Sequence, residues 1–152
     1  MKVKTIGVSL ALALGLGFAA NASAQAKPDV LVKQRQAAMT LIGKYFGPLG
    51  GMAQGRVPFN ADVVARNAGY LEALDKMPWD GFDASTSGEK SRTLPEAFKN
   101  PAKFKEAADA MQKAVAQLSA VAKSGNEANI KAAIGGVGKT CGGCHDNFRE
   151  KQ

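Results

Sequence analysis

Both cysteines and the only histidine of this 152-residue chain lie within five positions near its C-terminus, in the sequence KTCGGCHD at residues 139–146. Residues three and four positions apart lie on one side of an α-helix, so Cys141, Cys144 and His145 project together if this segment is helical. Apolar residues recur at helical spacing from Ile130 to Phe148, on the same side. The chain must therefore fold so that its last helix delivers two thiols and one imidazole toward the interior.

Five glycines in this segment oppose helix formation. Glycine lowers helix stability by up to ~1 kcal/mol relative to alanine at each interior position. We expect a helix that keeps them to have something large close to its backbone. The five are Gly135, Gly136, Gly138, Gly142 and Gly143.

The N-terminus has the form of a secretory signal peptide. Lys2 and Lys4 precede a short apolar run at residues 6–20, and Ala22-Ser23-Ala24 is a cleavage site of the small-x-small kind. The alternative is an uncleaved membrane anchor, but the run is short and rich in glycine for a span. We expect residues 1–24 to be removed and residues 25–152 to form the folded domain.

The composition of the remaining chain fits one domain with one sizeable core. Removing Lys2 and Lys4 lowers the formal net charge from +7 to +5. The basic residues are scattered without a block of like charge, which favours a solvated surface over a nucleic-acid patch. A redox partner with an acidic face would still be steered toward such a surface.

Helical spacing of apolar residues predicts four helices and no sheet. They are expected at residues 28–51, 61–77, 101–124 and 126–148, with a long connection from Trp79 to Lys99. Gly47-Pro48 should kink or loosen the end of the first helix, because proline lacks the backbone N–H. On the second helix, capped by Asn60 and ended by Pro78, one shared face is expected to carry Val63, Asn67, Tyr70, Leu74 and Met77.

Three alternative chemistries for Cys141, Cys144 and His145 fit the sequence poorly. A structural zinc site usually takes four cysteine and histidine ligands, and the chain offers three. A dithiol redox motif usually lies at the start of a helix, where the helix dipole lowers the first thiol's pKa, whereas this motif lies deep in one. A disulfide between the two cysteines would close too short a loop to add much stability.

The remaining interpretation of C-x-x-C-H is covalent haem attachment. Cys141 and Cys144 would each add to one vinyl group of haem, and His145 would become an axial ligand of the iron. The motif is specific when it follows a secretion signal, as it does here. Because only seven residues follow His145, any sixth iron ligand must come from upstream in the chain.

The motif lies within the segment VGKTCGGCHDNFR at residues 137–149. Three further segments extend the pattern: RQAAM at residues 35–39, GRVPF at 55–59 and PWDGF at 78–82. Over residues 25–152 the chain resembles the class II c-type cytochromes, which comprise the cytochrome c′ family and its c556-like relatives. C-x-x-C-H alone is common to all c-type cytochromes, whereas its C-terminal position combined with RQxxM is much more specific.

The resemblance implies an all-α, antiparallel four-helix bundle that holds one covalent haem c, in the bacterial periplasm, often as a homodimer through the first two helices. It places Arg35 and Gln36 at the haem edge near the propionates and Met39 over the distal face. Arg149 would lie on the proximal side, which is the side of the histidine ligand. A propionate contact by Arg92 is suggested by its charge alone.

Met39 separates two functions. As the sixth ligand it would give a low-spin haem that transfers electrons, and as a bulky lid it would leave a five-coordinate, high-spin iron that binds NO or CO. The residues themselves are compatible with both functions. The PWDGF loop and the Arg35-Gln36 pair resemble the five-coordinate cytochrome c′ branch. The sequence shows no acid/base or nucleophile constellation, so we do not expect an enzyme.

Overall fold

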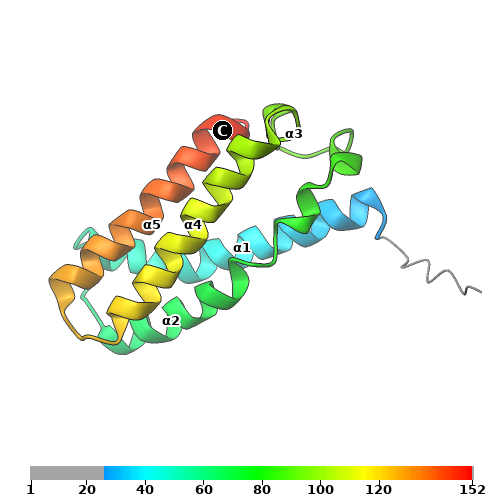
Figure 1. Cartoon of the computed structure of the whole chain (residues 1–152). Helices are drawn as coiled ribbons and strands as arrows, with labels where there is room; N and C mark the ends of the chain where they lie inside the picture. Colours follow the sequence, from blue (N-terminus) through cyan, green and yellow to red (C-terminus); the bar gives the residue numbers. More distant parts are fainter. Residues whose placement is uncertain (1–25, 152) are drawn as a thin grey trace, which may run out of the picture.

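The computed structural model describes residues 26–151 of the chain, and the predicted signal peptide at residues 1–24 lies outside this range. Within the described residues no helix has the length and apolar character that a membrane span needs. The elements in chain order are α1 (Pro28–Ala53), α2 (Ala61–Leu74), the short 3₁₀ helices η1 (Asp80–Phe82) and η2 (Ala84–Thr86), α3 (Glu96–Lys99), α4 (Pro101–Ala122) and α5 (Glu127–Phe148) (Figure 1).

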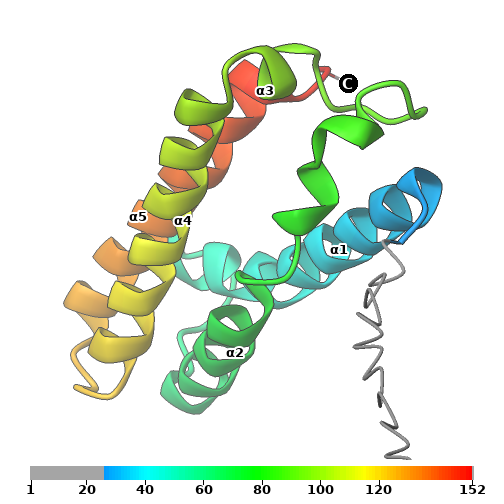
Figure 2. The ribbon, with the colours of Figure 1, turned by 45° about the vertical axis from the view of Figure 1, so that its right-hand side comes forward.

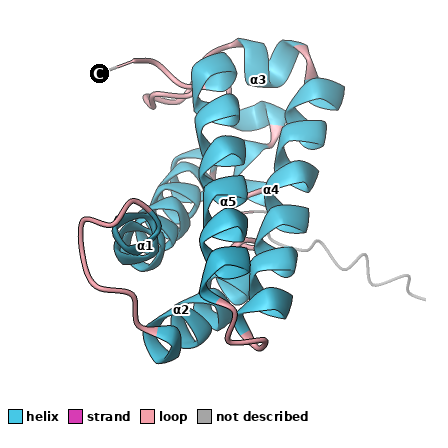
Figure 3. Ribbon diagram, turned by 90° about the vertical axis from the view of Figure 1, so that its left-hand side faces the viewer, coloured by secondary structure: helices cyan, strands magenta, loops and turns pink. Residues whose placement is uncertain are grey.

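The four long helices form a bundle in which each packs against two others. The contacting pairs are α1 with α2, α2 with α4, α4 with α5, and α5 with α1. Figure 3 shows α4 and α5 side by side along their length, with α1 and α2 on one side of this pair. The predicted all-α four-helix bundle is confirmed, and the short helices η1, η2 and α3 all lie in the connection between α2 and α4.

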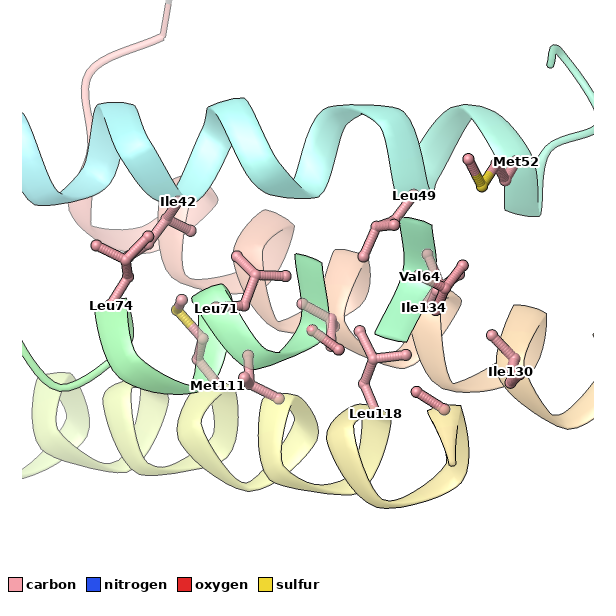
Figure 4. Close-up of a cluster of buried hydrophobic side chains, with 14 residues drawn as sticks. Ile42, Leu49, Met52, Val64, Leu71, Leu74, Met111, Leu118, Ile130 and Ile134 are labelled. Atoms are coloured by element: carbon pink, nitrogen blue, oxygen red, sulfur yellow. The ribbon is translucent and has the colours of Figure 1, made fainter. Parts of the chain in front are cut away.

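The core lies between all four long helices (Figure 4). Its members are aliphatic or methionine side chains that point inward at helical spacing, as the sequence pattern predicts. Fourteen buried residues make up this core cluster: Ile42, Leu49, Met52, Val64, Ala68, Leu71, Leu74, Met111, Val115, Leu118, Ala122, Ile130, Ile134 and Val137.

Local signals explain where the helices begin and end. Asn60 Oδ1 accepts a hydrogen bond from the Val63 N–H at 3.0 Å, and Asn126 Oδ1 accepts one from the Asn129 N–H at 2.9 Å. Each side chain thereby satisfies one of the free N–H groups at its helix start. Gly125, with φ of 70°, turns the chain between α4 and α5 in a conformation that favours glycine.

The predicted second helix is wrong in its end and in part of its buried face. α2 ends at Leu74, and its buried side is centred on Val64, Ala68 and Leu71, so Tyr70 is 46% exposed and Met77 is 56% exposed beyond the helix end. The predicted face was therefore rotated toward solvent. α1 runs through Pro48 to Ala53, close to its predicted bounds, and Pro48 lies on the exposed side, where water can satisfy the carbonyl that proline leaves unpaired.

A buried carboxyl group marks the end of α2. Asp75 is 2% exposed, and its Oδ1 has no hydrogen-bond partner within the described structure. Burial raises the pKa of Asp75 to about 6, with a smaller contribution from Glu72 in the same direction, while Lys76 opposes the shift. The Asp75 carbonyl also accepts hydrogen bonds from Trp79 Nε1 at 2.5 Å and Gln112 Nε2 at 3.3 Å. The junction of α2, α4 and the following loop therefore contains a group that is costly to ionise.

Asp75 makes the stability of the fold depend on pH. The pKa of Asp75 is higher in the folded than in the unfolded state, so ionising this carboxyl destabilises the fold. This loss of stability is absent below pH about 4 and complete above pH about 6. Asp75→Asn should raise the denaturant midpoint of unfolding at about pH 8 and match the parent chain near about pH 4. Asp80→Asn, at an exposed position, is the control. An Asp75→Asn variant that gains no stability at the higher pH would contradict this assignment.

Candidate functional site

A cavity of about 640 Å³ lies at the end of the bundle that contains the predicted motif. In Figure 2 the connection between α2 and α4 passes beside the N-terminal half of α1 and reaches α3 near the C-terminus. The cavity is enclosed by α1, this connection, α4 and α5. It is lined by Arg35, Gln36, Met39, Thr40, Ile42, Gly43, Phe46, Trp79, Phe82, Ser91, Arg92, Thr93, Phe104, Ala107, Met111, Cys141, Cys144, His145, Phe148 and Arg149.

The structure brings all the predicted site residues to this one cavity. Cys141, Cys144 and His145 lie on the last turns of α5, are each half-buried, and line the same cavity wall. Both thiols are free. The spacing of three and four positions on a continuous helix therefore produces the arrangement that the sequence predicted.

The surroundings of the three side chains disfavour a catalytic dithiol and keep the imidazole neutral. Burial raises the pKa of both thiols, which keeps them protonated, whereas a catalytic dithiol needs a lowered pKa. Burial also lowers the pKa of His145, and the positive charges of Arg149 and Arg92 lower it further. A neutral imidazole is the form that binds iron.

α1 contributes the opposite set of predicted residues. Arg35, Gln36 and Met39 lie within one turn of this helix and line the cavity. Gln36 is exposed at the cavity's edge, while Met39 is half-buried and packs against the core cluster. Met39 is therefore held by its neighbours and does not project freely into solvent.

Arg35 is buried, with 2% of its surface exposed, and it binds the connection between α2 and α4. Nη1 donates to the Gly81 carbonyl and, at 2.8 Å, to Thr86 Oγ1. Nη2 donates to Ser91 Oγ at 3.0 Å and Thr93 Oγ1 at 3.2 Å. All four acceptors are neutral, so the guanidinium is hydrogen-bonded but keeps an uncompensated positive charge.

Gly81 allows the connection to approach α1 closely. A Cβ atom at this position would lie 2.7 Å from Arg35 Cβ and 2.9 Å from the Leu31 carbonyl oxygen. Both distances are too short for a side chain to be accommodated without movement of the backbone. The glycine of the PWDGF segment is therefore required for the contact that also places the Arg35 guanidinium 4.5 Å from the centroid of the Phe82 ring.

Aromatic rings from three parts of the chain form an apolar wall of the cavity. Phe104 of α4 lies 4.6 Å from Phe82 and 5.3 Å from Phe148, measured between ring centroids. Trp79 stacks near Phe82 at 6.3 Å. Trp79 and Phe82 of the connection thus form part of the apolar wall of the cavity.

The predicted close approach to the glycines of α5 is found at one position. A Cβ atom at Gly138 would lie 3.5 Å from Cζ of Phe46, which also lines the cavity. The other four glycines of the segment have no such neighbour within 4 Å in the described structure. Their presence is therefore not explained by contacts of this chain's own residues.

Arg92 and Arg149 lie together beside the last turn of α5. Arg92 Nη2 donates to the Glu150 carbonyl at 2.5 Å. The Arg149 N–H donates to the His145 carbonyl at 3.2 Å, directly at the end of the helix. Both arginines line the cavity.

The donor set fits haem c. Haem c presents two vinyl-derived carbons, an iron, a flat apolar ring and two carboxylates. The cavity offers two thiols, one imidazole, aromatic walls and three arginines, and none of the lining residues in the described structure is acidic. In particular, the buried charge of Arg35 lacks a carboxylate from the protein, and an anionic group in the cavity would supply one.

Part of the lining was missed by sequence reasoning. Ser91 and Thr93 lie in a loop whose composition indicated only a connection, and their role depends on Arg35 reaching them across the fold. Phe104 of α4 also belongs to this part of the lining, in the wall between α4 and the connection. The hydroxyl residues carried no sequence signal, because they are separated from Arg35 by more than fifty positions.

Known proteins share this architecture. A family model described as Cytochrome C′ matches residues 30–149. Cytochrome c′ of Rubrivivax gelatinosus is 43% identical over 126 residues, which cover 82% of this chain and 98% of that protein. Its crystal structure superposes with a TM-score of 0.78 at 42% identity, over 82% of this chain and 98% of that one. A nitric oxide complex of a leucine-to-alanine variant of cytochrome c′ from Alcaligenes xylosoxidans has a TM-score of 0.77 at 36% identity, over 84% of this chain and 98% of that one.

The close approach at Gly81 can be tested by substitution. Gly81→Ala should destabilise the protein by about 1–3 kcal/mol, because the methyl group overlaps Arg35 and the α1 backbone. Gly88→Ala, in the same connection but with open space around it, should change stability by less than ~0.5 kcal/mol. Thermal and denaturant unfolding measure both. Equal stability of the two variants would show that the connection does not depend on this contact.

Proposed function

The chain belongs to the cytochrome c′ family, which binds one covalently attached haem c, and from this premise we propose that it is a periplasmic protein whose five-coordinate, high-spin haem binds NO and CO. Cys141 and Cys144 would form the thioether links and His145 would be the axial ligand. Capture or detoxification of NO is the physiological role that this chemistry would serve.

The position of Met39 is the observation that carries the proposal. Met39 lines the cavity from α1, whereas His145 reaches it from α5, and Met39 already packs against the core cluster. A thioether held by packing acts as a steric lid, which small neutral molecules can pass more readily than larger ones. Met111 also lines the cavity, but it is itself a member of the buried core cluster.

An open iron position gives haem its affinity for small gases, whereas a sixth protein ligand favours electron transfer. The nitric oxide complex of the Alcaligenes xylosoxidans relative supports the first function for this chain. In this proposal the polypeptide fixes the ring through Cys141 and Cys144, supplies neutral His145, and keeps the cavity walls apolar. In the alternative, a c556-like electron carrier, Met39 would bind the iron as the sixth ligand.

The periplasmic assignment rests on the predicted signal peptide and on the bacterial origin of the relatives. C-type haem is attached after export, so the motif and the signal support each other. A periplasmic redox partner would reduce the haem, and the net positive charge of the mature chain would steer a partner with an acidic face.

Replacing Met39 tests the gas-binding function directly. Met39→Ala should leave the reduced protein high-spin and speed NO and CO association by about tenfold or more, because the lid is shortened. Met52→Ala is the matched control, since Met52 lies on the same helix in the core and does not line the cavity. Stopped-flow absorbance measures both variants. A low-spin parent protein that becomes high-spin in Met39→Ala would instead identify Met39 as a ligand.

We also propose that the protein forms a homodimer through α1 and α2. Val30 and Leu41 on α1 are 36% and 41% exposed, and Tyr70 on α2 is 46% exposed, which leaves apolar surface on this pair of helices. Sedimentation velocity should give twice the mass of the mature chain, and Leu41→Asp should shift it toward the monomer. A monomeric parent protein at micromolar concentration would contradict this assembly.

A further inference from the structure

The end of α5 is held by a short segment of the connection. The Leu94 N–H donates to the Phe148 carbonyl at 2.9 Å, and the Glu150 N–H donates to the Arg92 carbonyl at 2.9 Å. Between these two bonds Thr93 and Arg149 form an isolated antiparallel bridge. The segment thus pairs with the residues that directly follow the His145 turn and satisfies one of the free carbonyls at the helix end.

The same segment is held from its other side by α1. Thr93 Oγ1 and Ser91 Oγ both accept from Nη2 of Arg35, at 3.2 Å and 3.0 Å. The other arm of the guanidinium, Nη1, binds Gly81 and Thr86 instead. One buried guanidinium therefore serves two different parts of the connection, and only its Nη2 arm leads to α5.

This contact matters because the last turns of α5 are intrinsically weak. Gly142 and Gly143 lie inside the motif, are exposed, and each lowers helix stability by up to ~1 kcal/mol relative to alanine. Arg149 follows His145 by one turn, and its N–H donates to the His145 carbonyl at 3.2 Å. The placement of Arg149 and of the helix end therefore depends on contacts from outside the helix.

We propose that Arg35 is a positioning residue for the His145 side of the haem site, acting through Thr93 on Arg149. The chain of contacts runs from the α1 guanidinium to the Thr93 hydroxyl, across the Thr93–Arg149 bridge, and to the turn that carries His145. Arg35, on the cavity wall opposite α5, thus sets the geometry around His145, the proposed axial ligand. The spectroscopic consequence rests on the proposed role of His145, whereas the structural link does not.

Hydrogen–deuterium exchange in the haem-loaded protein tests the structural link. Thr93→Val keeps the side-chain shape and removes one of the two acceptors of Arg35 Nη2, the one that is paired with Arg149, so exchange in the peptides containing Leu94 and Glu150 should become at least about tenfold faster. Thr86→Val is the matched control, because it removes an acceptor from the other arm of the same guanidinium. Thr86→Val should leave the exchange rate of these two peptides unchanged. Equal exchange in Thr93→Val and the parent protein would overturn the proposal.

A double-mutant comparison assigns the effect to Arg35. Arg35→Lys should speed exchange in the same two peptides. Thr93→Val in that background should add little, because both substitutions remove the same hydrogen bond between Arg35 and Thr93. Independent, additive effects would show that Thr93 does not transmit the influence of Arg35 and would contradict the proposal.

The iron–histidine stretching band in the resonance Raman spectrum of the reduced protein is the second readout. It should shift in Thr93→Val and Arg35→Lys and remain in place in Thr86→Val, which a general loss of stability would not produce. A band that is unchanged in all three variants would overturn the positioning role. If the proposed coordination were wrong, the parent protein itself would be low-spin, and the exchange experiment would still report on the structural link.

Discussion

Placing two thiols and an imidazole on the inner side of α5 interrupts the apolar seam of the bundle. The helix is buried along this side as far as Val137, and beyond it Cys141, Cys144 and His145 are half-buried against a cavity. The four helices cannot close over these polar and reactive groups. The bundle therefore needs another element to cover this end, and the connection between α2 and α4 provides it.

The covering element is fixed by one buried cation. Arg35 binds four neutral acceptors spread along the connection, and Gly81 lets the chain approach α1 closely enough for these bonds. Hydrogen bonds from a charged donor each contribute about 1.5–3 kcal/mol. The charge itself remains uncompensated by the protein, which suits a cavity for an anionic prosthetic group. The side chain that holds the connection thus also lines the cavity.

Most of the fold could be predicted from the sequence, because helical spacing and caps such as Asn60 and Asn126 are local signals. The motif on α5 was equally predictable, since its geometry follows from helix periodicity alone. The buried face of α2 could not be predicted, because Tyr70 fits the helical spacing of apolar residues as well as its buried neighbours do. The link from Arg35 to Thr93 depends on the path of an irregular connection, which no periodicity encodes.

We propose that the haem in this cavity has an iron that is open on the Met39 side. The most direct test is the optical spectrum of the purified protein, oxidised and reduced, before and after addition of CO. We expect a broad high-spin ferrous Soret band without sharp α and β bands, which shifts when CO is added. A sharp low-spin spectrum that does not respond to CO, or the absence of haem absorbance, would contradict it.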